Sequence, residues 1–275
     1  MSRRDGKKVA HIYTLDGARV EAIPPGFALY PYGAFTSFVA ADGAVLGWQQ
    51  HLERLAAGAR ELWGHELDPQ RLRDAVRSHF AIQGGSPASV RITIFPDTFS
   101  LAAPDEAEGC SFLVSSGPAD LPFAPRESFA VQSVQHTRRL AHLKSTDLFT
   151  QIGLRRAARI AGYDDALLLN GDSVLEGATW SILVWKDGRV VTPESNVLAS
   201  VTVAQLEQVA TALHWNFEFG SLTRSDLRGA DLVLGVNVNN PARAVSQIDG
   251  VGLAVDGSLL GSIAATFNDL RPETV

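Results

Sequence analysis

The feature that most constrains the fold of this chain is a stretch, residues 116–128, that interrupts a pattern of strands and helices. It has little hydrophobic periodicity and contains four turn-forming residues: Gly117, Pro118, Pro122 and Pro125. Such clusters mark loops, and strand-like segments begin again directly after it. Since 275 residues are enough for two modest domains, we predict an N-terminal domain over 1–115, an interdomain linker over 116–128 and a C-terminal domain over 129–275.

The N-terminal part predicts short strands followed by two helices. The dipeptides Asp16-Gly17 and Asp42-Gly43 are typical of two-residue hairpin turns, and apolar residues recur at helical spacing over 48–63. Asp68 is placed to cap a second helix that has Pro69 at its first position. We therefore expect a sheet covered on one face by two helices. The strands expected here are residues 9–15, 17–22, 35–40, 44–46, 89–95 and 110–115.

The C-terminal part repeats the alternation of strands and helices. Helices are expected over 147–161, from Val203 behind Thr202, and from about Ser258. The strands expected here are residues 129–135, 166–170, 173–175, 181–185, 190–191, 216–219, 232–236 and 244–248.

The composition excludes several classes of function. A net charge of -6 and a pI of about 5.6 leave no global basic field for nucleic acid, and no window approaches the roughly 18 consecutive apolar residues of a membrane span. The single cysteine, Cys110, cannot form an internal disulfide, and its apolar surroundings favour a buried strand residue over a nucleophile. The histidines lack the paired spacing of a metal site. We expect a cytoplasmic protein without metal, nucleic-acid or membrane partners.

Two residues point to chemistry, although each also has a plainer interpretation. Lys144 lies at a strand-to-helix junction beside Leu143, and partial desolvation there favours the neutral amine that imine chemistry requires. A surface lysine with a buried stem is the commoner case. Glu176 lies between two apolar strands, where a buried carboxylate must be paired or hydrogen-bonded. A solvated turn glutamate is the plainer interpretation of that residue.

Two further positions are suited to a phosphate group. Arg54 lies three residues after His51, on nearly the same helical face, and arginine binds phosphate through its planar fork. Most helical arginines are instead solvated. Val201 and Thr202 precede a helix, whose first backbone N–H groups attract anions. Thr202 also fits a simple N-cap, and the residues alone leave both roles open.

Taken in order, these segments resemble a known enzyme family. The matching segments are residues 51–55, 162–170, 171–177, 187–193, 198–202 and 248–250. In this respect the chain is similar to the class IV (fold-type IV) pyridoxal-phosphate enzymes, which include branched-chain aminotransferases, D-amino acid aminotransferases and aminodeoxychorismate lyases. The resemblance covers most of the chain and is strongest over residues 144–202.

The resemblance implies a two-domain α/β (α+β) fold, with a small N-terminal sheet-plus-helices domain and a larger barrel-like C-terminal α/β domain. It also implies that Lys144 holds pyridoxal 5'-phosphate as a Schiff base and that Glu176 keeps the pyridine nitrogen protonated. The cofactor-binding residues by resemblance are Arg54, Lys144, Glu176, Thr179, Val201, Thr202, Asn237 and Val238. The candidates for the substrate pocket are Phe35, Arg91 and Arg138.

The chain departs from the family pattern at several of these positions. Ser200 stands where a glycine usually precedes Val-Thr, and residues 236–240 (Val-Asn-Val-Asn-Asn) replace a stretch that commonly carries Ser or Thr hydroxyls for the phosphate. Asn237 or Asn239 is the expected substitute donor.

The resemblance implies a transaminase that exchanges an amino group between an amino acid and a 2-oxo acid. The alternative within the family is a lyase that releases pyruvate, as aminodeoxychorismate lyase does. A third hypothesis is a non-catalytic member of the fold. By the same resemblance, the protein is expected to form a homodimer.

Overall fold

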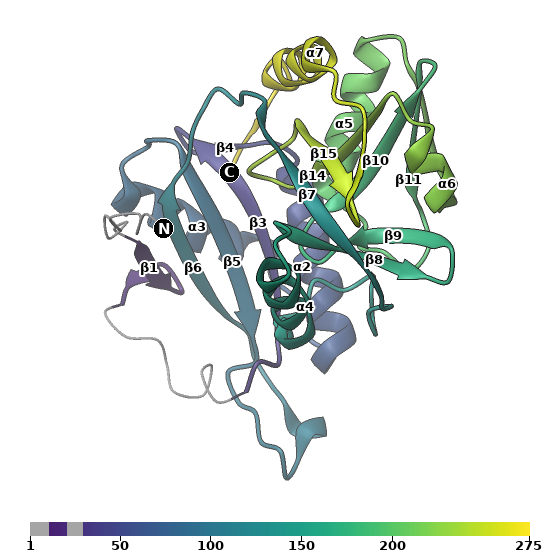
Figure 1. Cartoon of the computed structure of the whole chain (residues 1–275). Coiled ribbons are helices and arrows are strands. Elements are labelled where there is room, and N and C mark those ends of the chain that lie inside the picture. The colour runs from purple at the N-terminus through teal and green to yellow at the C-terminus, as the bar shows by residue number, and fades with distance from the viewer. Residues whose placement is uncertain (1–10, 21–29) are drawn as a thin grey trace. The chain divides into compact units, whose positions relative to one another are not determined.

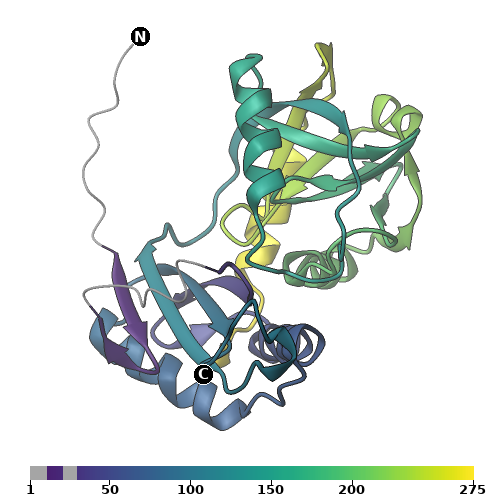
Figure 2. The ribbon, with the colours of Figure 1, turned by 90° about the horizontal axis from the view of Figure 1, so that it is seen from below.

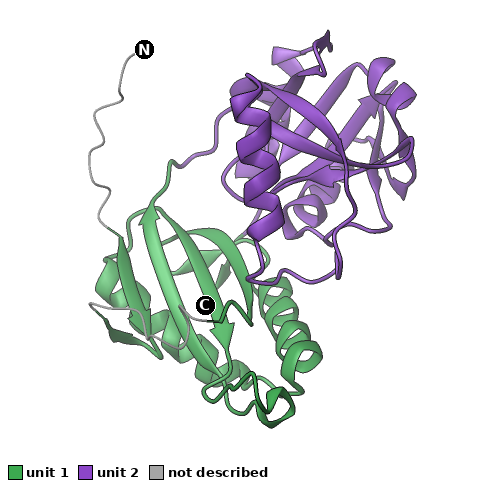
Figure 3. Cartoon of the chain, turned by 60° about the horizontal axis from the view of Figure 1, so that its bottom comes forward, with its two compact units in different colours: residues 1–120, 272–275 green, residues 121–271 purple. Residues whose placement is uncertain are grey.

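The computed structural model describes residues 11–20 and 30–275. The chain divides into two compact units, residues 1–120 with 272–275 (unit 1) and residues 121–271 (unit 2), coloured green and purple in Figure 3. The predicted strands 9–15 and 17–22 lie partly outside the described residues. No helix in the described ranges has the length and apolar character needed to cross a membrane.

The division between the units falls inside the stretch predicted as a linker, but the strands on either side extend into that stretch. β6 (Ser111–Pro118) and β7 (Arg126–Gln135) leave only residues 119–125 outside strands. The last four residues also differ from the predicted boundary, because β17 (Glu273–Thr274) returns to pair with β4 (Ala44–Val45) in unit 1. Local periodicity carries no information about such a long-range edge pairing.

Unit 1 is an antiparallel sheet with two helices (Figures 1 and 2). The strand order among the described residues is β17-β4-β3-β5-β6-β1-β2. The remaining strands are β1 (Ile12–Leu15), β2 (Ala18–Arg19), β3 (Ala34–Ala41) and β5 (Ala88–Phe95). Helix α2 (Trp48–Trp63) packs on β3 and β5, and α3 (Pro69–Gln83) packs on β1 and β6. Figure 2 shows both helices on the same side of the sheet, as predicted.

The local signals that predicted these elements are confirmed. Asp16, Gly17, Asp42 and Gly43 all have positive φ, as the central residues of type I′ hairpin turns require. The Asp68 side chain accepts hydrogen bonds from two backbone N–H groups of the first turn of α3. The caps and turns are therefore set by the sequence immediately around them.

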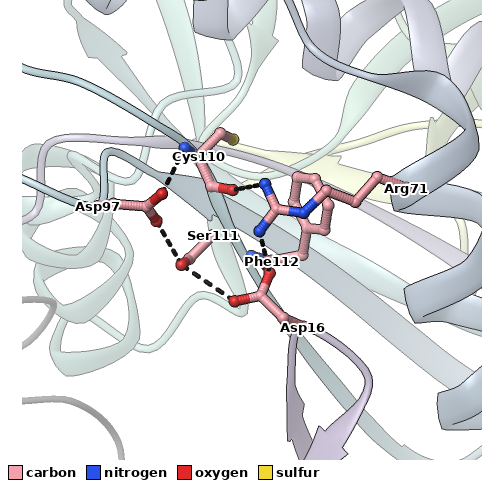
Figure 4. A network of polar contacts seen from close by, with 6 residues as sticks. All are labelled: Asp16, Arg71, Asp97, Cys110, Ser111 and Phe112. Atoms are coloured by element: carbon pink, nitrogen blue, oxygen red, sulfur yellow. Dashed lines mark hydrogen bonds and ion pairs between the residues drawn. The ribbon is translucent and has the colours of Figure 1, made fainter.

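A polar network ties the first hairpin of unit 1 to helix α3 (Figure 4). Arg71 donates from Nη1 to the carbonyl of Cys110 at 2.9 Å and from Nη2 to Asp16 at 3.2 Å. The Ser111 hydroxyl lies between the carboxylates of Asp16 and Asp97, and Asp97 also accepts from the Cys110 N–H at 3.1 Å. Because Ser111 has one hydroxyl hydrogen, only one of the two carboxylates accepts it at a time.

Unit 2 is a larger mixed sheet. Its order among the described residues is β12-β11-β10-β14-β15-β7-β8-β9-β13, with β16 paired to β15. β9 and β13 approach β10 and β11, so the sheet curls toward itself, in agreement with the expected barrel-like domain. The bounds are β8 (Asp165–Asn170), β9 (Ser173–Gly177), β10 (Ser181–Lys186), β11 (Arg189–Pro193), β12 (Asn216–Gly220), β13 (Leu222–Thr223), β14 (Leu232–Val236), β15 (Arg243–Ile248) and β16 (Val251–Gly252).

The helices of unit 2 begin and end close to the predicted residues, with two differences. They are α4 (Phe149–Ile160), α5 (Val201–Ala212), α6 (Arg224–Arg228) and α7 (Gly257–Asn268). Helix α5 starts earlier than predicted, because Ser200 rather than Thr202 is its N-cap and accepts from the Val203 N–H at 3.4 Å. Helix α6 was not predicted, since five residues are too few for a periodic apolar pattern.

The core of unit 2 depends on a close approach between backbone and aromatic rings. Phe129 and Trp180 pack edge to face with their centroids 5.3 Å apart. A Cβ atom at Gly235 would lie 2.4 Å from the Phe129 ring and 3.0 Å from Trp180. Glycine is therefore required on β14 for this ring pair to fit.

Candidate active site

Lys144 lies in the loop between β7 and α4 of unit 2, and its side chain is half-buried. The loop turns tightly, because the Leu143 N–H donates to the Leu140 carbonyl at 2.9 Å and Leu140 has a φ of 55°. Ala141 and Leu143, both within this turn, are buried. Lys144 therefore follows a loop segment that is anchored in the unit.

Glu176 is buried on β9, with 6% of its surface exposed. Its Oε1 accepts a hydrogen bond from Nε of Arg138 at 2.7 Å, and its Oε2 accepts one from the Leu198 N–H at 3.2 Å. A buried carboxylate with these partners is held in one orientation. The alternative interpretation of Glu176 as a solvated turn residue is therefore wrong.

Arg138 connects Glu176 to the loop that carries Lys144. Besides its ion pair with Glu176, it donates from Nη1 to the Leu143 carbonyl at 3.3 Å and from Nη2 to the Ala141 carbonyl. The sequence analysis names Arg138 as a candidate for the substrate pocket. In the structure its guanidinium donates to protein acceptors, namely the Glu176 carboxylate and two carbonyls of the loop before Lys144.

Glu176 also borders a cavity of about 140 Å³ that reaches the beginning of α5. Its lining includes Leu198, Ser200 and Val203, together with residues of β10 and β11. Helix α5 begins with Val201 and Thr202, directly after Ser200 of this lining. Glu176 and two residues at the start of α5, Ser200 and Val203, therefore line one cavity.

The other candidates in unit 2 lie in turns. Thr179 is exposed in the bend between β9 and β10. Asn237 and Val238 follow β14, and the Asn237 side-chain oxygen accepts from the Asn239 N–H at 3.0 Å and from the Asn240 amide at 3.3 Å. The Asn237 oxygen therefore shapes the turn.

Three candidates belong to unit 1. Arg54 lies on α2 after the buried His51, and burial lowers the pKa of the Arg54 guanidinium to about 10. Phe35 on β3 and Arg91 on β5 contact each other, with the Arg91 guanidinium carbon 3.7 Å from the centre of the Phe35 ring. Burial also lowers the pKa of Arg91. The structure thus brings two of the three substrate-pocket candidates together.

The sequence did not indicate the backbone amide of Leu198 as a partner of Glu176. Leu198 begins one of the segments that resemble the family. Nearly every residue type has a backbone N–H, so the residue type does not show which N–H donates to Glu176. The described residues contain no group of three or more His, Cys, Asp or Glu side chains that could hold a metal ion.

Comparison with known families gives one match over most of the chain. A family model described as amino-transferase class IV matches residues 33–248. A comparison of the sequence with curated proteins finds no match.

Solved structures share the fold at low sequence identity. A branched-chain aminotransferase from Thermoproteus uzoniensis, solved with norvaline, is 22% identical with a TM-score of 0.82, and the match covers 93% of each chain. A branched-chain aminotransferase from Escherichia coli is 18% identical with a TM-score of 0.82, covering 95% of this chain and 94% of that one. A hypothetical aminotransferase from Mycobacterium tuberculosis in its PLP-bound form is 18% identical with a TM-score of 0.78, covering 93% and 98%.

Proposed function

Because the chain belongs to the class IV aminotransferase family, we propose that it transfers an amino group between an amino acid and a 2-oxo acid through Lys144. Pyridoxal 5'-phosphate is the cofactor of this enzyme. The observation that supports the role of Lys144 is the link through Arg138, which binds both Glu176 and the loop directly before Lys144.

The residues of unit 2 fit this cofactor on chemical grounds. Lys144 supplies a primary amine, Glu176 a buried carboxylate, and the beginning of α5 a set of backbone N–H groups suited to a phosphate. When bound, the cofactor supplies an electron sink for the bond cleavage at the substrate α carbon. Nothing in the donor set of unit 2 conflicts with that group.

In this proposal, the residues of the chain have distinct roles. The Nζ of Lys144 would hold the cofactor covalently, and its free amine would serve as the base for the proton on the substrate α carbon. Glu176 would stabilise the protonated pyridine nitrogen, and its contacts with Arg138 and the Leu198 N–H fix the orientation of its carboxylate. The amides of Val201 and Thr202 at the start of α5 would bind the phosphate, and the phosphate-binding role of Arg54 stays a prediction.

The substrates follow from the same chemistry. We propose that Arg91, stacked on Phe35, binds a substrate carboxylate, since a guanidinium recognises that group through paired hydrogen bonds. Norvaline is bound in the Thermoproteus uzoniensis structure, and an aliphatic amino acid of that kind is the donor proposed for this chain. A homodimeric assembly and a cytoplasmic location stay predictions.

The experiment is a transfer assay with the reconstituted full chain. Norvaline, leucine and glutamate are tested as donors, in both chiral forms, with 2-oxoglutarate or pyruvate as the acceptor. Lys144→Ala should lower the rate by roughly 10²–10⁴-fold, the range for loss of a general acid–base group. Lys186→Ala is the matched control, because Lys186 is the other lysine of the described residues and is exposed at the end of β10. Equal rates for the wild type and Lys144→Ala would refute the proposal.

A second arm separates the two reactions of the family. The protein is incubated with aminodeoxychorismate and no 2-oxo acid, and pyruvate is measured. The proposed transaminase releases no pyruvate in this arm. Catalytic release of pyruvate would instead assign the lyase reaction.

A further inference from the structure

We propose that Arg138 is a positioning residue. Its guanidinium holds both the carboxylate of Glu176 and the loop of residues 140–144 (the Lys144 loop) in fixed positions. This inference rests on the proposed function, since it concerns the geometry of the same site. It adds to that function a physical connection between the proposed acid and the proposed amine, which lie on separate segments of unit 2.

The contacts of Arg138 run in two directions. Nε donates to Glu176 at 2.7 Å, while Nη1 donates to the Leu143 carbonyl at 3.3 Å and Nη2 to the Ala141 carbonyl. The side chains of Arg138 and Glu176 are 12% and 8% exposed. A guanidinium presents its donors in a fixed plane, so the positions of its acceptors are coupled.

The orientation of Glu176 is fixed at both oxygens. Arg138 binds Oε1, and the Leu198 N–H binds Oε2 at 3.2 Å. Leu198 belongs to the segment that leads into α5, whereas Arg138 belongs to the segment that leads to Lys144. Without Arg138, the carboxylate would keep one backbone donor and could rotate about it.

Arg138 also supplies hydrogen-bond donors to two carbonyl groups of the Lys144 loop. Ala141 and Leu143 are buried, and buried carbonyl groups outside regular structure need hydrogen-bond donors. Removing the guanidinium would take one hydrogen-bond donor from each of three acceptors: the Ala141 carbonyl, the Leu143 carbonyl and the buried Glu176 carboxylate. A lysine would keep the charge, but it is a compact charge that cannot reach all three acceptors with planar geometry.

The test compares Arg138→Lys with Arg159→Lys in the full chain loaded with cofactor. Arg159 is exposed near the end of α4, so the control makes the same chemical change away from the site. Arg138→Lys should lower kcat by about 10–100-fold, as the loss of a supporting contact behind a functional group does. It should also shift the pH at which the visible absorption band of the bound cofactor changes. A purely structural arginine would lower the yield of folded protein and leave that pH unchanged.

A second measurement leaves Arg138 in place, so it does not depend on the folding of an Arg138 variant. If the guanidinium couples the two segments, Glu176→Ala should increase amide hydrogen exchange over residues 140–146, because Arg138 loses its carboxylate acceptor and holds the loop less firmly. Unchanged exchange in that segment would overturn the inference.

The outcomes separate this inference from the proposed function. A wild-type protein that shows no transfer activity contradicts the proposed function itself. A wild-type protein that is active, with Arg138→Lys matching it in kcat and in the pH dependence of the absorption band, contradicts only the role of Arg138.

Discussion

Lowering the pH should destabilise unit 1 through one buried histidine, His79. This residue lies on α3 and has no exposed surface. Its Nδ1 is 2.8 Å from the Thr14 hydroxyl on β1, and its Nε2 is 2.8 Å from the Ser116 hydroxyl on β6. A neutral imidazole satisfies both contacts with one donor and one acceptor, and it bridges the helix to two strands.

The size of the effect follows from the shift in pKa. Burial lowers the pKa of His79 to about 4, from an ordinary value of 6.5. Since the folded pKa is the lower one, the unfolded chain binds more protons between these values. The stability from neutral His79 is therefore complete above pH 6.5 and is lost as the pH falls through this window. The loss is about 2 kcal/mol at pH 5 and about 3 kcal/mol below pH 4.

The assay is urea unfolding of the full chain at pH 8 and pH 5, comparing the wild type with His79→Gln and His65→Gln. His79→Gln lowers stability at both pH values but removes the titrating group. The wild type and the half-buried control His65→Gln should therefore lose about 2 kcal/mol more between pH 8 and pH 5 than His79→Gln does. Equal losses in His79→Gln and the wild type would refute the reasoning.

Three other changes have defined outcomes. Gly235→Ala should cost about 1–3 kcal/mol in the free energy of unfolding, because the new methyl group overlaps the Phe129 ring; an unchanged melting temperature would contradict this. Asp68→Ala should cost about 1 kcal/mol, measured in the same way, since two N–H groups of α3 lose their acceptor. Burial first, and then the nearby charge of Asp97, raise the pKa of the Cys110 thiol to about 12. The native protein at pH 8 should therefore not react with iodoacetamide until urea unfolds it, and rapid labelling of the folded chain would be the contrary result.

Much of the fold could be predicted because it is encoded locally. Asp16-Gly17 and Asp42-Gly43 carry their own turn geometry, and the Asp68 cap contacts residues two and three positions away. The return of residues 272–275 to β4 could not be predicted. Two-residue strands have no periodicity, and their pairing depends on the whole unit.

The site was only partly predictable for a related reason. Family resemblance pointed to Lys144 and Glu176 by residue type and order. The role of Arg138 depends on a contact across 38 positions of sequence, which residue type does not reveal. The sequence offered Arg138 only as a candidate for the substrate pocket. In the folded loop its guanidinium contacts Glu176.

The measurement that tests the central claim most directly is the site of cofactor attachment. The full chain is loaded with pyridoxal 5'-phosphate, reduced with borohydride, digested and mapped by mass spectrometry. Between residues 11 and 275 the only lysines are Lys144 and Lys186, so the assignment is unambiguous there. We predict a single stoichiometric label on Lys144, with loss of the visible absorption band. A label on Lys186, or no covalent label on a cofactor-loaded and active protein, would contradict the account.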